Sequence, residues 1–351
     1  MLAIDPIVAE YAQPSIYSRR QPEKTPLFQA VLGNLESWLE ERWEDPPAQY
    51  VEREFRNYLK CGILAHGFAR AHCEQCGHDF LIAFSCKGRG VCSSCCSRRM
   101  AEIAAHLVDH VIPYFPVRQW VLSLPKRLRY YIHHNAKLCS KVLRIFMNEI
   151  NKQLHSCSDS PLDSQFGGVS FLQRFGSRLN VHPHYHSCVI EGLFSVQNEE
   201  VRFHEAVITN TDIYAVEKRV RKRVIRLFCR HGLLLKEEAD NMLRWDHSGF
   251  SLDGSVLIEA DDREGLERLI RYCSRPPFSG SRLRTEADGK LLYIPPKPGT
   301  RGKCLLSLTP MELIERVAQL IPPPRKHRHH YHGVFAPNSP LRRHVVRLAM
   351  S

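Results

Sequence analysis

The sequence predicts an α+β protein with a central antiparallel β-sheet flanked by helices. Between about residues 113 and 275, segments typical of strands are mixed with helical segments, without the regular βαβ order that a parallel sheet requires. Of the 351 residues, 43% are hydrophobic and 25% are charged, which is typical of folded globular proteins. At about 150 residues per domain, this length predicts two or three domains.

The individual elements are predicted from the spacing of apolar residues and from the turn residues between them. The expected helices lie within 26–60 (two), and at 100–111, 133–154, 212–235, 262–273 and 309–320. The expected strands lie at 117–124, within 167–201 (two or three) and at 249–259. A β-hairpin is expected around Asp288 and Gly289, because an Asp-Gly pair favours a tight hairpin turn.

The formal net charge of +12 favours a polyanionic partner, either nucleic acid or an anionic membrane surface. The first residues lack the basic and apolar regions of a signal peptide, and no apolar run of about 18 residues predicts a transmembrane helix. We therefore expect a cytoplasmic protein. In that reducing compartment, clustered cysteines are expected to bind metal rather than to form disulfides.

Two CxxC pairs mark a cysteine-rich segment near residues 61–100. Cys73 and Cys76 form one pair, and Cys92 and Cys95 form the other. This spacing is typical of a zinc ribbon, in which two such turns hold one ion with four thiolates. Because four thiolates leave no open position for water, we expect the zinc to be structural.

Two further cysteines, Cys61 and Cys86, are additional candidate zinc ligands. Cys86 could replace one member of the four, or join Cys61 and either His66 or His78 around a second ion; the sequence leaves these alternatives open. Basic residues of the same segment, Lys87 and Arg89, are candidates for phosphate contacts. The alternative is a solvated basic loop.

A row of histidines in the segment 180–190 is the second unusual feature. Residues two apart on a strand share a face, so His184 and His186 are expected to point the same way. Two imidazoles on a sheet can chelate one metal ion, and Mg²⁺ or Mn²⁺ with open positions can polarise a phosphate oxygen. The candidates for a third ligand are Gln173, Asn180 and His182, among which we rank Gln173 first.

Several motifs, taken together and in order, resemble the rolling-circle transposases of the insertion sequence ninety-one family. The tripeptide His184-Tyr185-His186 is similar to the His-hydrophobe-His motif of HUH endonucleases. The other motifs lie at 73–78, 85–95, 171–180, 271–277 and 330–338. The resemblance covers about residues 50 to 345.

The resemblance implies a HUH-type central antiparallel sheet preceded by a helical and zinc-ribbon-like N-terminal domain. It also implies an enzyme, a tyrosine transposase that nicks one DNA strand, forms a 5′-phosphotyrosine intermediate and rejoins the strand during rolling-circle DNA transposition. The matching catalytic tyrosine is Tyr272. Many relatives have a second tyrosine four residues earlier, where this chain has Arg268, so the chain resembles single-tyrosine relatives.

The implied cofactors are structural Zn²⁺ and catalytic Mg²⁺ or Mn²⁺, and the implied partners are single-stranded DNA at transposon ends and target DNA. No membrane partner is expected. Arg271 and Arg275 flank the tyrosine and could hold the scissile phosphate. The basic tail, with Arg325, Lys326 and Arg328, is expected to contact the DNA backbone. The basic helix at 212–235 could do the same or form a solvated face.

The chain is expected to divide into a helical segment (1–60), a cysteine-rich zinc-binding domain with a linker helix (61–112), a catalytic nuclease domain (113–280) and a basic DNA-binding extension (281–351). A replication initiator or relaxase is an alternative within the same class. A non-catalytic zinc-dependent DNA-binding regulator is an alternative from another class. The expected location is the bacterial cytoplasm, in association with the nucleoid.

Overall fold

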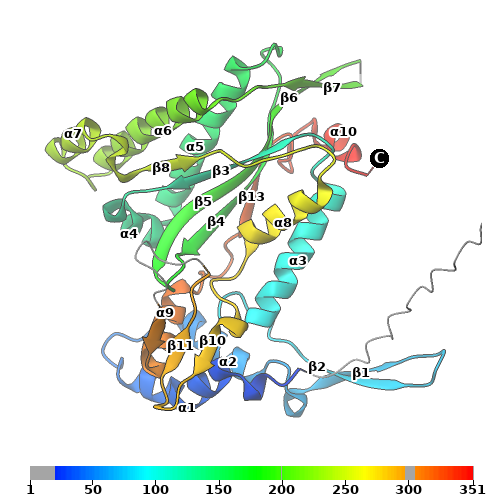
Figure 1. Cartoon of the computed structure of the whole chain (residues 1–351), viewed down its shortest axis with the longest axis vertical. Coiled ribbons are helices and arrows are strands. Elements are labelled where there is room, and N and C mark those ends of the chain that lie inside the picture. The colour runs from blue at the N-terminus through cyan, green and yellow to red at the C-terminus, as the bar shows by residue number, and fades with distance from the viewer. Residues whose placement is uncertain (1–19, 199, 297–304, 351) are drawn as a thin grey trace, which may run out of the picture.

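The computed structural model describes residues 20–198, 200–296 and 305–350 (Figure 1). A central β-sheet lies between two groups of helices in one half of the molecule, and a smaller region of helices and short strands forms the other half. The first residues, on which the expectation about a signal peptide rests, lie outside the described part. Within the described ranges, no helix is long and apolar enough to cross a membrane.

The central sheet is antiparallel. Its strands are β3 (Val117–Ser123), β4 (Gly167–Phe175), β5 (Val181–Ile190), β8 (Ser251–Asp253), β9 (Leu257–Ile258) and β13 (His329–Gly333). Their order is β13-β4-β5-β3-β8, and β9 also pairs with β3. This confirms the predicted α+β class. The strand that carries the histidine row, β5, lies in the middle of the sheet and pairs with a neighbour along both edges.

Helices cover both faces of this sheet (Figure 1). One face packs against α4 (Lys126–His134), α5 (Ala136–Ser156), α6 (Asn210–Arg230) and α7 (Lys236–Arg244), and the other against α3 (Ser93–His110) and α8 (Arg263–Ser274). Successive residues of β5 therefore enter different cores. Tyr185 is buried on the first face, where its hydroxyl donates to the carbonyl of Cys139 at 2.9 Å.

The second half of the molecule combines segments from both ends of the described chain. Its elements are α1 (Pro26–Glu40), α2 (Gln49–Lys60), β10 (Leu283–Thr285), β11 (Leu291–Tyr293), β12 (Leu306–Leu308) and α9 (Pro310–Leu320). They share one hydrophobic core, in which Trp38 of α1 donates from its indole Nε1 to Glu315 of α9 at 3.1 Å. Residues 283–320 therefore support the helices α1 and α2.

The remaining elements lie at the edges of these two halves. A hairpin of β1 (Phe68–His72) and β2 (Asp79–Ala83) projects from the second half. A ribbon of β6 (Gly192–Gln197) and β7 (Glu200–Glu205) extends the chain beyond β5, and α10 (Arg342–Arg347) packs beside β7. Short 3₁₀ helices span Pro22–Lys24, Leu64–His66, His247–Gly249 and Gly280–Arg282.

Several predicted elements differ from the structure in detail. The helix expected at 100–111 begins earlier, at Ser93, and the helix expected at 212–235 ends at Arg230. The helix expected at 133–154 begins after Asn135, whose side chain caps α5 by accepting from the Leu138 amide, and α4 precedes it. The strands expected at 249–259 are present as β8 and β9, and both pair with β3. The expected hairpin around Asp288 and Gly289 is present as β10 and β11.

Candidate functional site

A row of three histidines lies along one face of the middle strand β5. The side chains of His182, His184 and His186 follow one another, with ring centres 5.0 Å apart for the first pair and 4.8 Å apart for the second. This is the face that α8 covers, as the neighbouring Cys188 shows by packing on Cys273 of that helix. The rings therefore lie between the sheet and the C-terminal part of α8.

His184 is held as a neutral imidazole with one nitrogen available. Its Nδ1 lies 2.8 Å from the carbonyl oxygen of His182, which can only accept, so Nδ1 carries the proton. Burial lowers the pKa of His184 to about 3. The lone pair of Nε2 is therefore free near neutral pH, and neutral imidazole is the form that binds metal ions.

Three buried polar atoms near this row have no hydrogen-bond partner in the described part of the chain. They are Nε2 of His182, Nε2 of His186 and Oε1 of Gln173. Gln173 lies on β4 directly opposite His184 in the strand register. Buried polar atoms without partners cost stability, and they are typical of sites that are completed by a ligand. Two imidazole nitrogens and one amide oxygen are donors that suit a divalent metal ion with open positions. The ligand atoms of all three histidines together are not within 4.8 Å of one another.

The orientation of the third histidine is supported from β3. His186 is only 2% exposed, and its Nδ1 lies 3.1 Å from the side-chain Nε2 of Gln119. Gln119 also contacts Cys273 of α8 at 3.4 Å. Gln119 was not predicted as a site residue; its position on a strand that pairs with the histidine strand could have indicated it. Asn180, one of the candidate third ligands, lies in the turn between β4 and β5, where its carbonyl accepts from Gly176.

Tyr272 lies in the last turn of α8, directly above the histidine row. Its ring centre is 5.5 Å from that of His186, and the two rings are nearly perpendicular at 86°. The side chain of Gln173 fixes this end of the helix, because its Nε2 donates to the carbonyls of Tyr272 at 2.8 Å and Cys273 at 3.0 Å. Tyr272 remains 39% exposed, so a large substrate can reach it.

The two arginines that flank Tyr272 have different environments. Arg275 lies with its guanidinium carbon 5.1 Å from the centre of the Tyr272 ring, and its Nε is buried without a partner among the described residues. Arg271 instead forms an ion pair at 2.7 Å with Glu267 on the same helix. Arg268 is held in a similar way by Glu264 at 3.4 Å. The structure thus brings Arg275 to the tyrosine and engages Arg271 elsewhere.

A small basic cavity adjoins this centre. It has a volume of about 90 Å³, and its lining includes Gln173 and Arg275 from the centre together with Arg89, Lys326 and Arg328. Hydrogen bonds connect Arg89 with the tail residues. The Arg89 side chain donates to the carbonyl of Lys326, and the Arg328 side chain donates to the carbonyl of Arg89. The predicted basic loop and basic tail therefore meet beside the histidine row.

Two other predicted phosphate contacts, Lys87 and Arg325, do not line this cavity. Both are exposed and have positive φ angles, of 50° and 58°. The tail itself is ordered by the sheet, because β13 pairs with β4 along its edge.

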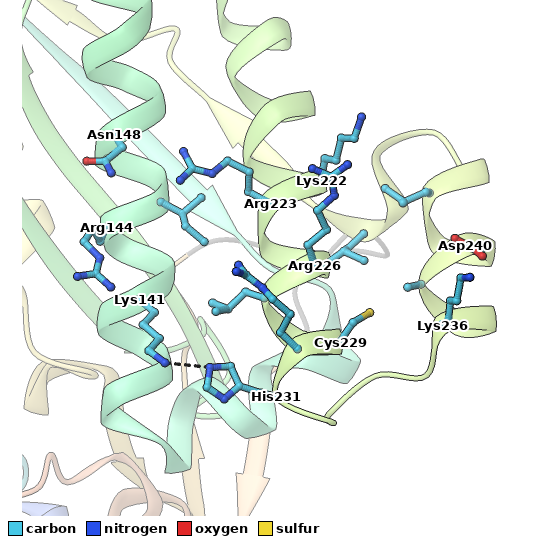
Figure 2. Close-up of a pocket in the computed structure, with 16 residues that line it drawn as sticks. Lys141, Arg144, Asn148, Lys222, Arg223, Arg226, Cys229, His231, Lys236 and Asp240 are labelled. Atoms are coloured by element: carbon cyan, nitrogen blue, oxygen red, sulfur yellow. Dashed lines mark hydrogen bonds between the residues drawn. The ribbon is translucent and has the colours of Figure 1, made fainter.

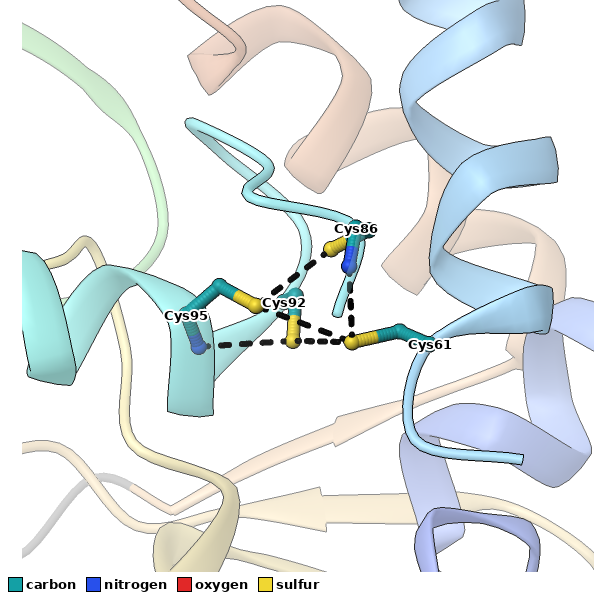
Figure 3. Close-up of side chains that lie close together, drawn as sticks. All are labelled: Cys61, Cys86, Cys92 and Cys95. Atoms are coloured by element: carbon teal, nitrogen blue, oxygen red, sulfur yellow. Dashed lines mark hydrogen bonds between the residues drawn. The ribbon is translucent and has the colours of Figure 1, made fainter. Parts of the chain in front are cut away.

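A second centre consists of four cysteines between α2 and α3 (Figure 3). The Sγ atoms of Cys61, Cys86, Cys92 and Cys95 all lie within 4.8 Å of one another. The Sγ of Cys61 is 3.7 Å from that of Cys92 and 3.6 Å from that of Cys95. Four sulfurs at about 2.3 Å from a tetrahedral zinc ion are about 3.8 Å apart, so the arrangement fits Zn²⁺.

Donors around these sulfurs suit thiolates. The amide of Cys86 donates to Cys61 Sγ at 3.3 Å, and the amide of Gly88 donates to Cys86 Sγ at 3.3 Å. The guanidinium of Arg20, which the sequence analysis missed, lies 3.4 Å from Cys61 Sγ. Hydrogen bonds from outside the ligand set orient the ligands of a metal and stabilise their charge.

This cluster differs from the predicted pairing of two CxxC turns. Cys73 and Cys76 lie in the turn of the β1–β2 hairpin, away from the four other cysteines. Cys61 and Cys86 lie on either side of the base of that hairpin, where the Gly62 amide donates to the Phe84 carbonyl at 2.9 Å. The pairing of β1 with β2 therefore brings Cys61 and Cys86 close together and places Cys73 and Cys76 at the far end of the hairpin.

Comparison with known families agrees with both centres. A family model described as "Transposase zinc-binding domain" matches residues 33–124, and a model described as "Putative transposase" matches residues 167–343, half of the chain. The protein belongs to the insertion sequence ninety-one family of transposases. The first match contains the four-cysteine cluster, and the second contains the histidine row, Tyr272 and the basic tail.

Two curated relatives resemble this transposase over most of its length. One is the "Transposase for insertion sequence element IS801" of Pseudomonas savastanoi pv. phaseolicola, 23% identical over 290 residues that make up 79% of this chain and 68% of the relative. The other is "Putative transposase y4qJ" of Sinorhizobium fredii (strain NBRC 101917 / NGR234), 25% identical over 299 residues, 78% of this chain and 71% of the relative. No solved structure matches at a comparable significance.

Two properties of the transposase follow from this membership and from the structure. It acts on DNA, in agreement with its net charge of +12. Its zinc is structural, because the four thiolates of the cluster complete the coordination of the ion and join α2 to the start of α3.

Proposed function

We propose that this transposase is a HUH-type single-strand DNA endonuclease and strand transferase that works through a 5′-phosphotyrosine intermediate in rolling-circle transposition. The observation that carries this proposal is the position of Tyr272 above the histidine row, 5.5 Å from the ring of His186. A nucleophile beside imidazoles that can bind a metal ion is the arrangement that metal-assisted phosphoryl transfer requires. The proposed substrates are single-stranded transposon ends and target DNA.

The metal would be Mg²⁺ or Mn²⁺. His184 would hold it through Nε2, and His186 would do so through Nε2 once the Gln119 amide turns so that its Oε1 accepts from Nδ1–H. Oε1 of Gln173 or Nε2 of His182 would be the third ligand, since these two buried atoms lack partners in the described chain. When bound, the ion polarises a non-bridging oxygen of the scissile phosphate.

In the proposed reaction, the hydroxyl oxygen of Tyr272 attacks the scissile phosphorus. The bond from phosphorus to the tyrosine oxygen forms, and the bond to the 3′ oxygen of the preceding nucleotide breaks. The proton leaves the tyrosine hydroxyl, and a proton is taken up by the departing 3′ oxygen, which becomes a free 3′-OH. The phosphodiester energy is conserved in the phosphotyrosine, so a later attack by a 3′-OH restores a DNA strand and the free tyrosine.

Arg275 is the cation best placed to assist this step. Its guanidinium lies beside the Tyr272 ring and lines the basic cavity, so it would contact the phosphate on which negative charge develops. Arg89, Lys326 and Arg328 would hold adjacent phosphates of the strand. Lys87, Arg271 and Arg325, which do not line the cavity, would contact phosphates of the strand outside it.

One tyrosine per subunit limits the number of covalent links. The position one helical turn before Tyr272 is Arg268, which is engaged by Glu264. Each subunit would therefore carry one phosphotyrosine at a time. A 3′-OH or water would resolve the link, or Tyr272 would act a second time.

The proposed roles of the segments follow the predicted division of the chain. After the helical segment 1–60, residues 61–112 would form the zinc-binding domain. Residues 113–280 would form the nuclease domain, and residues 281–351 would form the extension that supplies the basic tail. Because the proposed substrate is chromosomal and element DNA, we also infer association with the nucleoid.

A nicking assay tests the proposal. Single-stranded DNA from the ends of the element, labelled at its 3′ end, is incubated with Mg²⁺ or Mn²⁺ and then denatured. We expect a labelled covalent adduct with the wild type and with Tyr214→Phe, a variant in an exposed tyrosine of α6, and no adduct with Tyr272→Phe. An adduct of equal yield with Tyr272→Phe would show that another residue is the nucleophile. Strong binding without any wild-type adduct would favour a regulator that does not cleave.

A further inference from the structure

A groove on the opposite face of the sheet from the histidine row is lined by basic side chains (Figure 2). It lies between α5, α6 and α7 and has a volume of about 1020 Å³. Seven of its lining residues are lysine or arginine, and one, Asp240, is acidic. The sheet and its first hydrophobic core separate this groove from Tyr272, so the two sites cannot share one phosphate.

The basic residues form an ordered row on α6. Lys222, Arg226 and Arg230 are spaced four residues apart, all three are exposed, and Figure 2 shows Lys222 and Arg226 on the side of α6 that borders the groove. Each step of four residues advances about 6 Å along the helix, close to the rise of two nucleotides in one strand of duplex DNA. Arg144 of α5 also lines the groove.

The charge of this row is not neutralised by the protein. Glu149, a buried carboxylate of α5, already accepts from Arg219 at 2.9 Å, from Lys152 at 3.3 Å and from Arg223. Within the described residues, Lys222, Arg226 and Arg230 form no ion pair. Like charges four residues apart on a helix repel one another and lower its stability. A row of unpaired positive charges on one helix suits an anionic ligand, which would relieve this repulsion.

The other lining residues identify the class of ligand. The groove floor is aliphatic, with Ile145, Ile225 and Leu243 among its residues, and no phenylalanine, tyrosine or tryptophan lines it. Sites for single strands stack bases on aromatic rings, which this groove does not offer. Contacts would therefore be to phosphates, as in sequence-independent binding of a duplex, whose bases are stacked inside.

We propose that the α5–α7 groove binds the sugar–phosphate backbone of double-stranded DNA without regard to sequence. The transposase then has two DNA sites on opposite faces of its sheet, one for the strand that it processes and one for duplex DNA. The second site does not depend on the cleavage chemistry proposed above, and it can be tested in protein that does not cleave.

The test measures the affinity of zinc-loaded full-length Tyr272→Phe protein for a fluorescent 20-base-pair duplex of arbitrary sequence at several salt concentrations. The groove variant also carries Lys222→Gln, Arg226→Gln and Arg230→Gln. The control instead carries Arg56→Gln, Arg70→Gln and Lys290→Gln, which remove the same charge from residues already paired with carboxylates.

We expect the groove variant to bind the duplex at least tenfold more weakly than the control at the same salt concentration. The slope of log K against log salt should become about 2.7 less steep, because roughly 0.9 is lost for each phosphate contact removed. A third variant keeps the positive charge at each position by exchanging lysine and arginine (Lys222→Arg, Arg226→Lys, Arg230→Lys). It should bind the duplex with an affinity within threefold of that of the Tyr272→Phe protein, which distinguishes lost charge from misfolding.

Equal affinity of the groove variant and the control for the duplex would overturn the proposal. A loss restricted to a single-stranded 20-mer, or to inorganic polyphosphate, with unchanged duplex binding would also overturn it, because the ligand would then be of another kind.

Discussion

The ring of Tyr272 meets the ring of His186 nearly edge to face, with centres 5.5 Å apart, although the two residues come from a helix and a strand far apart in the sequence. Their contact is fixed by Gln173, which donates to the backbone carbonyls at the end of α8. The same side chain leaves its Oε1 free beside the histidines. One glutamine thus links the position of the tyrosine to that of the imidazoles.

Replacing Gln173 by alanine should slow nicking by about 10- to 100-fold, because both the helix end and a candidate metal ligand lose support. The check is a single-turnover nicking rate measured over a range of Mn²⁺ concentrations. Gln29→Ala, at an exposed position of α1, is the matched control and should nick at the wild-type rate. Wild-type rates for Gln173→Ala at every Mn²⁺ concentration would contradict this role.

The two arginines beside the tyrosine should differ in importance. Arg275→Ala should lower the nicking rate by about 100-fold, since removing one donor to a developing negative charge typically costs that much or more. Arg271→Ala should change the rate by less than about threefold, because Arg271 is engaged by Glu267 at the surface of α8. Rates measured at saturating DNA test this order, and a larger loss for Arg271→Ala would reverse our assignment.

Zinc content should distinguish the four clustered cysteines from the hairpin pair. Cys61→Ser or Cys86→Ser should lose bound zinc and unfold at a lower temperature, because a structural zinc site stabilises the fold that it joins. Cys76→Ser, at the exposed turn of the hairpin, should keep the zinc of the cluster. Metal analysis of purified protein gives the answer; retention of zinc by Cys61→Ser together with its loss in Cys76→Ser would contradict the arrangement.

Stability should fall as the pH decreases below about 6.5, in part because of His332 on β13. Burial lowers the pKa of His332 to about 4, whereas the unfolded chain has the ordinary value of about 6.5. The unfolded state therefore binds more protons between these two values, and the folded state loses stability as the pH falls through that window. At pH 5 this residue should contribute a loss of roughly 2 kcal/mol.

Urea unfolding at pH 7 and pH 5 measures this effect. His332→Gln should lose less stability than the wild type between the two pH values, by the amount just given. The exposed His110 of α3 is a suitable control position, and His110→Gln should follow the wild type. An identical pH dependence for His332→Gln and wild type would show that His332 is not held neutral by burial.

The histidine strand could be predicted because its signal is local. Alternation within a strand determines which residues share a face, and the apolar residues after His186 indicated a buried strand before any pairing was known. The helices at the N-terminus were predictable for the same reason, as their apolar spacing reports one buried face. The position of Tyr272 above the strand required the family resemblance, because nothing local relates α8 to β5.

The cysteine cluster could be predicted only in part. The short spacing between Cys92 and Cys95 is a local signal, whereas Cys61 and Cys86 are brought together by the closing of the hairpin between them. The strand β13 was not predicted, because its sequence from His329 to His332 is polar and lacks the apolar alternation of a strand. Its pairing with β4 depends on the tertiary structure.

Peptide mapping of the trapped protein–DNA adduct by mass spectrometry tests the phosphotyrosine mechanism most directly. We expect the nucleotide to be attached through a 5′ phosphate to the peptide containing Tyr272, and His184→Ala to prevent adduct formation while the zinc content is unchanged. A nucleotide attached to any other tyrosine, or a cleaved strand without a covalent link, would rule out this mechanism.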